Sequence, residues 1–457
     1  MFTKILTKLG FTKEETSWIL YDVGNSAQVL TTCTVIFPLL IAKITPGDSS
    51  VYVGWANAIY AIILAVISPV LGTMADYKDK KMKMFKFFLF MGIFGGFGLA
   101  LPFIDYRAAI VIFIIAMLGY NGSIIFYDAF IVDVCDDERV DKVSAAGYAW
   151  GYIGSVLPFL IFVIPFALVT LLGDPKTGDL VLGSFTLSYR MACGLTMGMA
   201  VLWWLVYSRP MLKNVKQKNF HEPVPHVVRE SFSHLYHTFR DIKKNKNIFL
   251  FCISYFFYID CVNTVIKMAV SLATEMGSSD VMSLVVVIVI NIVACPFSIL
   301  FGKLVEHVGS KKMIYVGILG YVGVVLAGSL IKTYPSFIWV VALLVGMFQG
   351  GIQSVSRSYF AKLIPDKADS NEFFGFFSVF SKFSAILGPM AVSTIIMITG
   401  ETQYGILGLI PMMLLGMLFL AFVKDPESEQ KFHKKKTIDD KQGLTSCYGK
   451  AAFFQCF

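Results

Sequence analysis

One stretch of the chain places two charged and two uncharged polar side chains inside an otherwise apolar run. They stand at positions i, i+3, i+4 and i+7, which is one face of an α-helix; they are Asp260, Asn263, Thr264 and Lys267. A carboxylate and an ammonium group on one face could bind a solute that carries both signs of charge. They could equally pair with each other as a purely structural contact. Because an ionisable group in an apolar run is costly unless it is paired or lines a polar space, we expect this face to point into a cavity or toward a partner helix.

Other apolar runs carry polar stripes of the same kind. Asp22, Asn25 and Ser26 repeat the pattern of Asp260, Asn263 and Thr264 at an offset of 238 residues. Further along the chain, two polar residues share a helical face near position 125, two more lie near position 350, and a lysine stands deep in a later run. The candidate binding or coupling residues are therefore Asp22, Asn25, Asn121, Asp128, Asp260, Asn263, Lys267, Gln349, Gln353 and Lys382.

Simpler roles remain open for several of these residues. Asp22 could stabilise a helix N-terminus near water, and Lys267 could extend its ammonium group to the membrane surface. Arg357, at the end of its apolar run, is interpreted as a loop anchor. Tyr148, Trp150 and Tyr152 are interpreted as packing residues.

The elements that carry these residues are predicted from composition and from run length. Hydrophobic residues make up 56% of the chain, charged residues only 15%, and the mean hydropathy is +0.68, whereas soluble domains are about 25% charged. A membrane-spanning helix needs about 20 apolar residues. Twelve such runs are present, at 17–42, 52–75, 84–104, 107–132, 143–171, 188–208, 247–274, 281–305, 313–332, 336–358, 372–398 and 403–423. The predicted fold class is an all-α membrane protein with twelve transmembrane helices.

Sequence motifs exclude several other classes of protein. The chain has no phosphate-binding loop, zinc-finger or dinucleotide fingerprint, and its eight cysteines are scattered without a Cys-x-x-Cys pair. We therefore expect no cofactor, no metal site and no catalytic cluster. The net charge of +8 lies in short loops between apolar runs, so it indicates membrane orientation and no nucleic-acid partner. No removable signal peptide is expected at the N-terminus.

The distribution of basic residues predicts the orientation and the organisation of the chain. If the N-terminus is cytoplasmic, 32 of the 39 lysines and arginines fall on the cytoplasmic side and 5 in outer loops, as the positive-inside rule requires. Both termini are then cytoplasmic. The predicted units are a six-helix bundle (1–208), a basic central loop (209–246), a second six-helix bundle (247–423) and a cytoplasmic tail (424–457). Apolar residues at helical spacing over about 232–242 predict an amphipathic helix that lies on the membrane surface or, equally well, a helix packed beneath the bundle.

The two halves resemble each other, which predicts an internal duplication. Gly72-x-x-x-Asp76 is followed by two lysines, and Gly302-x-x-x-Glu306 is followed by two lysines at an offset of 230 residues. A glycine permits close helix contact, and an acid can meet a helix N-terminus or a basic partner. These two loops are therefore candidates for gates that form in one conformation and break in another, although static, solvated loops would show the same pattern.

Several segments resemble the major facilitator superfamily and, more narrowly, the vacuolar-effluxer family and its bacterial relatives. The resemblance is carried by WILYDVGNSA (18–27), VSAAGYAWGYIG (143–154) and FFYIDCVNT (256–264), and most specifically by GGIQSVSRSYFAKLIP with EFFGFFSVFSKFSAILGP (350–365 and 372–389). It implies two pseudo-repeated six-helix bundles in which spans 1, 4, 7 and 10 line a central cavity. Cys261 departs from the family pattern, which has glycine after the aspartate.

The resemblance implies secondary transport, and amino-acid export in the fungal vacuolar members. We therefore expect a transporter of a small polar solute that works by alternating access between the two halves. Proton coupling would have to use Asp22, Asp128 or Asp260, because all six histidines lie in cytoplasmic segments. Sugars or other organic solutes, or a sensor or scaffold without turnover, remain as alternatives. We expect a monomer in the cell membrane, with the lipid bilayer as its surroundings.

The predicted topology can be tested by cysteine labelling. A single thiol introduced in 209–246 should stay unlabelled by a membrane-impermeant maleimide in intact cells and become labelled once the cells are opened. A thiol introduced in the outer loop near residue 176 serves as the positive control. Labelling of the 209–246 thiol in intact cells would refute the orientation.

Overall fold

The computed structural model describes residues 2–45, 49–174, 179–222, 245–275, 280–331 and 333–425, without the side chains of 49–51, 182, 266–284, 383–386 and 402. Among these residues, twelve helices are long and apolar enough to cross a membrane. The prediction of an all-α membrane protein with twelve spans is therefore confirmed. The expected amphipathic helix at 232–242 and the tail beyond residue 425 lie outside the described residues.

The first half of the chain supplies six spans and a small two-stranded hairpin. Its elements are α1 (Phe2–Lys8), α2 (Lys13–Gln28), the π-helix η1 (Val29–Ile36), α3 (Phe37–Ile44), α4 (Ser49–Ala75), α5 (Lys81–Leu99), α6 (Tyr106–Ala129), α7 (Ile131–Val134), α8 (Val140–Phe162), α9 (Ile164–Leu172), β1 (Leu180–Leu182), β2 (Phe185–Leu187) and α10 (Tyr189–Asn214). The first span is continuous from α2 through η1 to α3, with the π-helical segment in its middle.

The second half repeats the helical content without the hairpin. Its elements are α12 (Lys246–Glu275), α13 (Asp280–Val308), α14 (Ser310–Ser329), α15 (Phe337–Leu363), the 3₁₀-helix η2 (Lys367–Asp369), α16 (Ser370–Thr399), α17 (Thr402–Leu407) and α18 (Leu409–Phe422). The twelfth span is formed by α17 and α18 together.

Local sequence signals account for several helix starts. Thr12 and Glu15 form a reciprocal capping box at the start of α2, which satisfies two backbone N–H groups that would otherwise lack partners. Asp105 and Ser188 cap α6 and α10 in the simpler way, through one side-chain oxygen. Gly309 precedes α14 with φ +93°, a conformation that glycine adopts without steric cost.

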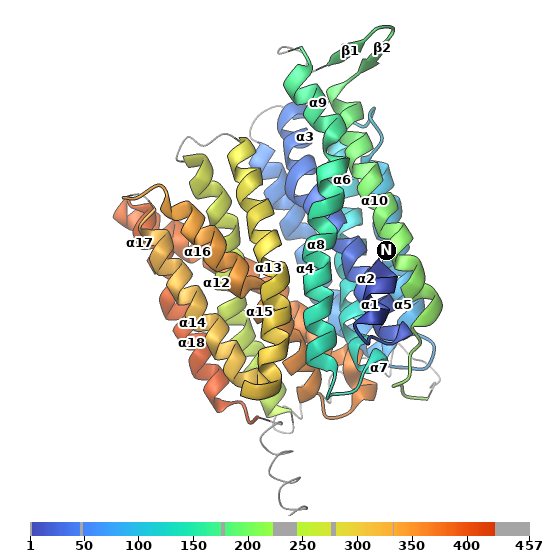
Figure 1. Ribbon diagram of the computed structural model, residues 1–457, viewed down its shortest axis with the longest axis vertical. Helices are drawn as coiled ribbons and strands as arrows, with labels where there is room; N and C mark the ends of the chain where they lie inside the picture. Colours follow the sequence, from blue (N-terminus) through green and yellow to red (C-terminus); the bar gives the residue numbers. More distant parts are fainter. Residues whose placement is uncertain are drawn as a thin grey trace, which may run out of the picture.

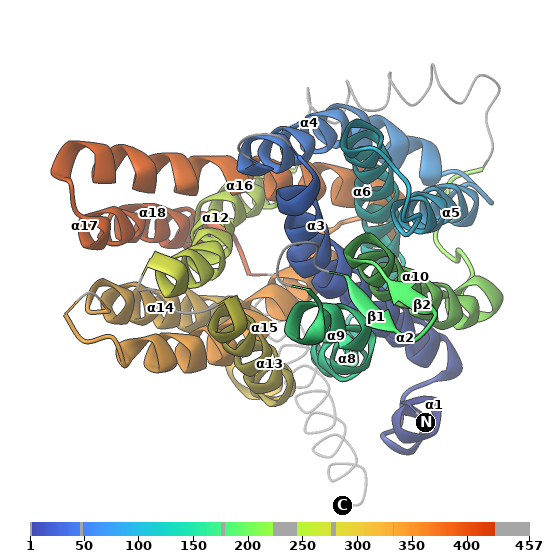
Figure 2. The same cartoon turned by 90° about the horizontal axis from the view of Figure 1, so that it is seen from above.

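The two halves form two bundles that stand side by side (Figures 1 and 2). Their interface is made mainly by two helix pairs, α4 with α16 and α8 with α13, and α8 also contacts α15. Seen from above, the first-half helices occupy one side of the molecule and the second-half helices the other (Figure 2). The interface therefore brings spans 2 and 5 of one half against spans 11, 8 and 10 of the other.

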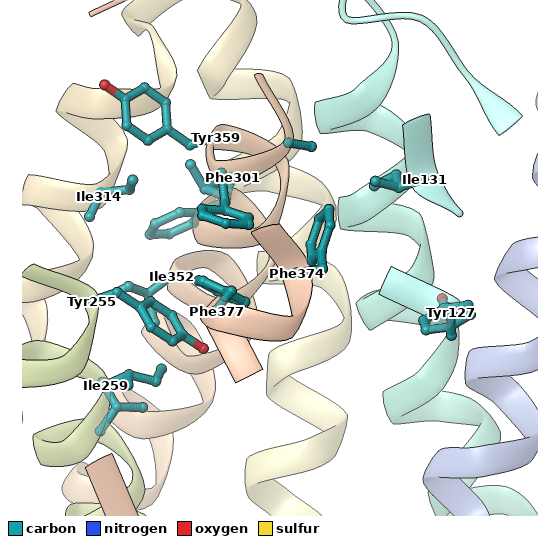
Figure 3. Close-up of a cluster of buried hydrophobic side chains, with 14 of the residues drawn as sticks. Tyr127, Ile131, Tyr255, Ile259, Phe301, Ile314, Ile352, Tyr359, Phe374 and Phe377 are labelled. Atoms are coloured by element: carbon teal, nitrogen blue, oxygen red, sulfur yellow. The ribbon is translucent and has the colours of Figure 1, made fainter. Parts of the chain in front are cut away.

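Aromatic side chains fill much of the core of the second half (Figure 3). The ring of Phe377 lies 4.2 Å from that of Tyr255 and 4.5 Å from that of Phe360, measured between centroids, and Phe374 lies 5.0 Å from Phe360. These rings come from α12, α15 and α16. Aromatic pairs at such separations add about 0.5–1.5 kcal/mol beyond the area they bury, so they hold these three helices together as one body.

The loop after α4 closes one end of the interface. The Asp76 carboxylate accepts hydrogen bonds from the backbone N–H groups of Asn371 (2.8 Å) and Glu372 (2.9 Å) and from Asn371 Nδ2 (2.7 Å). A carboxylate at a helix N-terminus is favourable because it meets unpaired N–H groups and the positive end of the helix dipole. Asp76 therefore fastens the first half to the start of α16, as one of the two possibilities drawn from the motif anticipated.

Lys81 and the segment after α10 complete this closure. The Lys81 ammonium group, fully buried, contacts Asp133 Oδ2 at 2.6 Å and donates to Ser370 Oγ at 3.1 Å. Asp133 Oδ1 accepts in addition from the backbone N–H groups of Lys218 and Asn219. Residues 215–222, placed in the central loop by the sequence, thus pack under the first bundle, and α10 runs to Asn214 rather than ending at 208.

The second copy of the motif is built differently. Gly302 packs against α8 so closely that a Cβ atom there would lie 2.5 Å from the Cβ of Ala145. The carboxylate at this junction comes from Asp141 of α8, which pairs with Lys362. Glu306 is exposed and has no bonded partner among the described residues.

Closure at Asp76 depends on the missing side chain of Gly72, and this can be tested. A Cβ at Gly72 would lie 2.3 Å from the carbonyl oxygen of Asn371, so Gly72→Ala should open this end of the interface at a cost of roughly 1–3 kcal/mol. The readout is maleimide labelling of Ser370→Cys, a position buried behind this contact, measured by mass spectrometry of that peptide. Labelling should rise severalfold.

Gly54→Ala is the matched control, since it lies in the same helix with nothing within 4 Å of the added Cβ. Equal labelling in the two alanine variants would contradict the proposed role of Gly72.

Candidate functional site

A cavity of about 210 Å³ lies between the two bundles, lined by polar and aromatic side chains. It is formed by α2, α6 and α8 of the first half and by α15 of the second. The lining residues are Asp22, Asn25, Ser26, Tyr120, Ile124, Tyr127, Asp128, Tyr148, Tyr152, Gln349, Gln353 and Arg357. Three formal charges, two negative and one positive, therefore share one small space within the membrane-spanning part of the molecule.

Arg357 of α15 joins the two halves across this cavity. Its Nη1 atom lies 3.1 Å from Asp128 Oδ1 and 3.6 Å from Asp22 Oδ2. The other guanidinium nitrogens donate to Ser144 of α8, Nε to the hydroxyl at 3.0 Å and Nη2 to the backbone carbonyl at 3.1 Å. Since only 3% of Arg357 is exposed, this cation is desolvated, and its hydrogen-bond and ion-pair partners among the described residues belong to the opposite half.

Aromatic rings surround the same guanidinium group. Its central carbon lies 4.4 Å from the ring centroid of Tyr148 and 4.6 Å from that of Trp18. Trp18 is itself fixed, because its indole N–H donates to the carbonyl of Tyr127 at 2.8 Å and its ring stacks on the Tyr127 ring. Cation–π attraction reaches about 2 kcal/mol where the cation is desolvated, so the rings hold the guanidinium plane in place.

Asp22 is positioned by α6 and by a glycine of α8. The Tyr127 hydroxyl donates to Asp22 Oδ2 at 2.6 Å, and Asn25 Nδ2 donates to Asp22 Oδ1 at 3.3 Å. Gly147 leaves room for the pair, because a Cβ there would lie 2.7 Å from Asp22 Oδ2 and 2.9 Å from Arg357 Nη2. Asp22 is thus a buried mid-helix acid, and its interpretation as a helix N-terminal residue near water is wrong.

A second polar contact crosses between the halves beside the cavity. The Lys382 ammonium group of α16 donates to Asn121 Oδ1 of α6, and Asn121 Nδ2 donates to the carbonyl of Met117. Tyr152 of α8 also donates to Gln353 Oε1 of α15, at 3.3 Å. The Lys382–Asn121 and Tyr152–Gln353 contacts each pair a side chain of one bundle with a side chain of the other, so relative movement of the bundles would break them.

The structure gathers five of the ten residues singled out in the sequence into this cavity: Asp22, Asn25, Asp128, Gln349 and Gln353. Asn121 and Lys382 form the neighbouring cross-half contact just described.

The polar face of span 7 lies elsewhere. Asp260 and Asn263 do not line the cavity. Asp260 is fully buried beside α16, where a Cβ at Gly388 would lie 2.9 Å from its Oδ1 atom. The Lys267 side chain lies outside the described residues.

Two interpretations drawn from the sequence need correction. Arg357 is not a loop anchor but the central cation of the site, and Tyr148 and Tyr152 line the cavity rather than only packing. Gln349, Gln353 and Arg357 stand at i, i+4 and i+8 on one face of α15, a signal that was present in the sequence. Trp150, by contrast, packs against Phe2 with ring centroids 5.5 Å apart. Among the described residues, no group of three or more His, Cys, Asp or Glu side chains is arranged to hold a metal ion.

Comparison with solved structures finds the same fold of two six-span bundles in membrane transporters. A major facilitator superfamily transporter, FucP, in the outward conformation superposes with a TM-score of 0.68, covering 90% of this chain and 98% of that one at 11% identity. A bacterial homologue of the iron transporter ferroportin, in the outward-facing state, gives a TM-score of 0.62 with 90% and 98% coverage at 16% identity. At these identities the likeness concerns the fold.

Sequence comparison identifies the family. The chain belongs to the vacuole effluxer Atg22-like family, whose pattern matches residues 46–138 and 133–433. YxiO, an MFS-type transporter of Bacillus subtilis (strain 168), is 38% identical over 425 residues, which cover 92% of this chain and 96% of YxiO. Autophagy-related protein 22 of Vanderwaltozyma polyspora is 25% identical over 250 residues, 47% of either chain. The recognition drawn from the sequence motifs is thereby confirmed.

The charge balance around Arg357 can be tested through stability. Arg357→Gln leaves two carboxylates buried without their cation, so the free energy of unfolding should fall by about 3–5 kcal/mol and the thermal midpoint in detergent should drop clearly. Combining it with Asp22→Asn and Asp128→Asn removes the uncompensated charges and should restore most of the midpoint.

Arg190→Gln is the control, because Arg190 is an exposed arginine and its loss should leave the midpoint unchanged. A triple variant no more stable than Arg357→Gln would show that the carboxylates and the cation are not energetically coupled.

Proposed function

We propose that this chain is a secondary active transporter that moves a small zwitterionic solute, with amino acids as the first candidates, by alternating access of its two bundles. The observation that carries the proposal is the cavity in which Asp22, Asp128 and Arg357 meet between the halves. Its volume of about 210 Å³ lies below the roughly 300–1,000 Å³ of pockets that hold drug-sized ligands. It is suited to a compact solute.

The chemistry of the lining favours a solute with both signs of charge. A solute carboxylate can bind the Arg357 guanidinium in a bidentate geometry, and an ammonium group can donate to Asp22 or Asp128. Gln349 and Gln353 supply additional uncharged hydrogen-bonding groups on the same helix as Arg357. Sugars would use the amide and tyrosine groups but would leave the three charges without a counterpart, which costs desolvation energy.

The proposed cycle begins from the state that the structure presents. Cross-half contacts gather where α4, α6 and α15 end and where α16 begins, which is the side of the N-terminus; they include Asp76 with Asn371 and Arg357 with Asp128. That side, cytoplasmic by the charge pattern, is closed. Opening it requires these bonds to break together, and solute binding supplies part of the free energy by taking over the partners of Arg357.

Proton coupling is part of the proposal and would use the two acids of the site. Asp22 and Asp128 share one guanidinium group. When the carboxylate of a zwitterionic solute takes the place of Asp128 on Arg357 and its ammonium group pairs with Asp22, Asp128 is left without a cation, and a proton taken up by Asp128 would neutralise it. Asp128 is the better candidate because Asp22 keeps its hydrogen bond from Tyr127. The cell membrane is the proposed location, because the relative YxiO comes from a bacterium.

Transport by purified protein in liposomes tests the function. We expect an imposed inward proton gradient to drive accumulation of at least one radiolabelled amino acid from a mixed set, with no uptake of glucose or xylose. Uptake of a sugar and of no amino acid would overturn the solute class. Binding of an amino acid without flux in either direction would favour a sensor.

The coupling role of Asp128 predicts a split between two kinds of flux. Asp128→Asn should abolish proton-driven accumulation, because the site can no longer take up the charge-balancing proton, while solute exchange across liposomes loaded with the same solute should persist within about threefold. Asp136→Asn, at an exposed acid outside the spans, should change neither flux. Loss of exchange and accumulation together in Asp128→Asn would show that Asp128 binds solute rather than couples protons.

A further inference from the structure

A second cavity, outside the transport path, lies at the end of the molecule that carries the N-terminus. Its volume is about 590 Å³, and it is formed by α1, by the start of α2 and by the end of α10. Its lining residues, here named the basic groove, are Thr3, Thr7, Phe11, Lys13, Thr16, Ser17, Leu20, Val206, Arg209, Pro210, Lys213 and Asn214. Three cations and no acid line this groove.

Helix geometry explains why these residues meet. Lys13, Thr16 and Ser17 stand at i, i+3 and i+4 on one face of α2, and Arg209 and Lys213 stand at i and i+4 on α10. The floor between the two helices is fixed, because Asn214 Nδ2 donates to Ser17 Oγ at 2.9 Å and Ser17 Oγ donates to the carbonyl of Lys13 at 2.7 Å. The groove is therefore a built feature of three packed helices.

The cations of the groove differ from their neighbours at the same end of the bundle. Lys81, Arg139 and Lys218 each form an ion pair with an acid, namely Asp133, Glu15 and Glu14. Lys13, Arg209 and Lys213 have no acidic partner within the part of the chain that the structure describes. Three like charges around one cavity repel one another, so the groove is most favourable when an anion occupies it.

A buried hydroxyl provides an independent sign of a ligand. Thr16 is 3% exposed and lines the groove, and its Oγ1 atom makes no hydrogen bond to any described residue. Buried polar atoms are almost always satisfied, by protein, water or ligand. A donor hydroxyl beside three cations matches the oxygen atoms of a phosphate group, which accept hydrogen bonds only.

The position of the groove identifies the source of the phosphate. Leu202 and Val206, which precede Arg209 on α10 by about two turns and one turn, are exposed by 52% and 43%, as lipid-facing side chains of a span are. The cations thus stand where the apolar surface of the span ends, which is the depth of phospholipid headgroups. Acyl chains of a lipid bound there would lie along Leu202 and Val206, whereas a free phosphate ion would leave this apolar surface unused.

We propose that the basic groove is a binding site for the headgroup of an anionic phospholipid, with its phosphate between Lys13, Arg209 and Lys213. Basic pockets at the cytoplasmic ends of membrane helices bind anionic headgroups by the same electrostatics. Because the groove includes α1 and α10, a bound lipid would tie the N-terminal helix to the sixth span and would hold both at the bilayer surface.

Binding to the delipidated full-length protein in neutral detergent tests the proposal. The probes are dioctanoyl phosphatidylglycerol, dioctanoyl phosphatidylcholine and inorganic phosphate, with dissociation constants from thermophoresis. We expect phosphatidylglycerol to bind at least tenfold more tightly than phosphatidylcholine. The triple variant Lys13→Gln, Arg209→Gln, Lys213→Gln should lose roughly a hundredfold in affinity, at about 1 kcal/mol for each cation.

A matched variant removes the same charge from the same end of the molecule. Lys83→Gln, Lys86→Gln, Lys216→Gln changes three exposed lysines outside the groove and should cost less than threefold. Equal losses in both triple variants, or equal binding of the two lipids, would overturn the site. Displacement of phosphatidylglycerol by inorganic phosphate at a concentration similar to that of the lipid would overturn the lipid assignment.

If the groove triple variant fails to fold, Thr16→Val serves instead. This variant keeps the shape of the groove and its cations but removes the hydroxyl. It should lower the affinity for phosphatidylglycerol by about threefold and leave the affinity for phosphatidylcholine unchanged. Unchanged affinity for phosphatidylglycerol in Thr16→Val would exclude the hydroxyl contact on which the proposal relies.

Discussion

The structure depends on one desolvated cation. Arg357 is withdrawn from water, and within the part of the chain that the structure describes it is compensated by groups of the opposite half, namely two carboxylates, a serine and a set of aromatic rings. A charge in such surroundings is tolerable only while its partners stay within a few ångströms. The relative position of the two bundles is therefore fixed at Arg357. Gly147 leaves the space that this ion pair occupies, and the Tyr127 hydroxyl donates an additional hydrogen bond to Asp22.

The contacts at the end of the molecule near the N-terminus form a second layer that acts with this cation. Asp76 holds the start of α16, Lys81 reaches Ser370, and His221 Nε2 lies 2.6 Å from Asp369 Oδ1. All three contacts meet the first turn of α16 or the 3₁₀-helix directly before it. One short stretch of the second half thus receives several of the polar bonds that seal this side. Movement of α16 alone would release many of them at once, which makes the closure cooperative.

The sequence predicted the large-scale features well because they rest on strong, repeated signals. Twelve apolar runs follow from length and composition, and the structure agrees with them. The loop motif allowed Asp76 to meet a helix N-terminus, as it does, and its role in a gate stays a prediction. The composition of the site was predicted only in part. Span 7 was expected to contribute to the site because its polar residues follow one another on one face, yet Asp260 lies against α16 and outside the cavity. Which side of a helix faces a cavity is set by packing between distant segments, and helical periodicity does not contain that information.

Arg357 shows the same limit from the other side. Arg357 lies next to the end of the predicted apolar run (336–358) and therefore resembles a residue that flanks a span. In the structure, α15 continues six residues past it to Leu363. Likewise, the two copies of the loop motif look alike in sequence but differ in chemistry, because Asp141 of α8 takes the place that Glu306 was expected to fill. A duplicated pattern predicts a duplicated backbone more securely than it predicts duplicated contacts.

The division of charge between the halves has a consequence for how the protein is made. Both acids of the site, Asp22 and Asp128, belong to the first half, and their cation belongs to the second. Ribosomes synthesise the first half earlier, so its two carboxylates enter the membrane before the arginine that neutralises them exists. Until span 10 arrives, they must remain hydrated or carry protons. The newly made first bundle therefore exposes two carboxylates without a cation. Their attraction for the arginine of the second bundle favours pairing of the two halves within one chain.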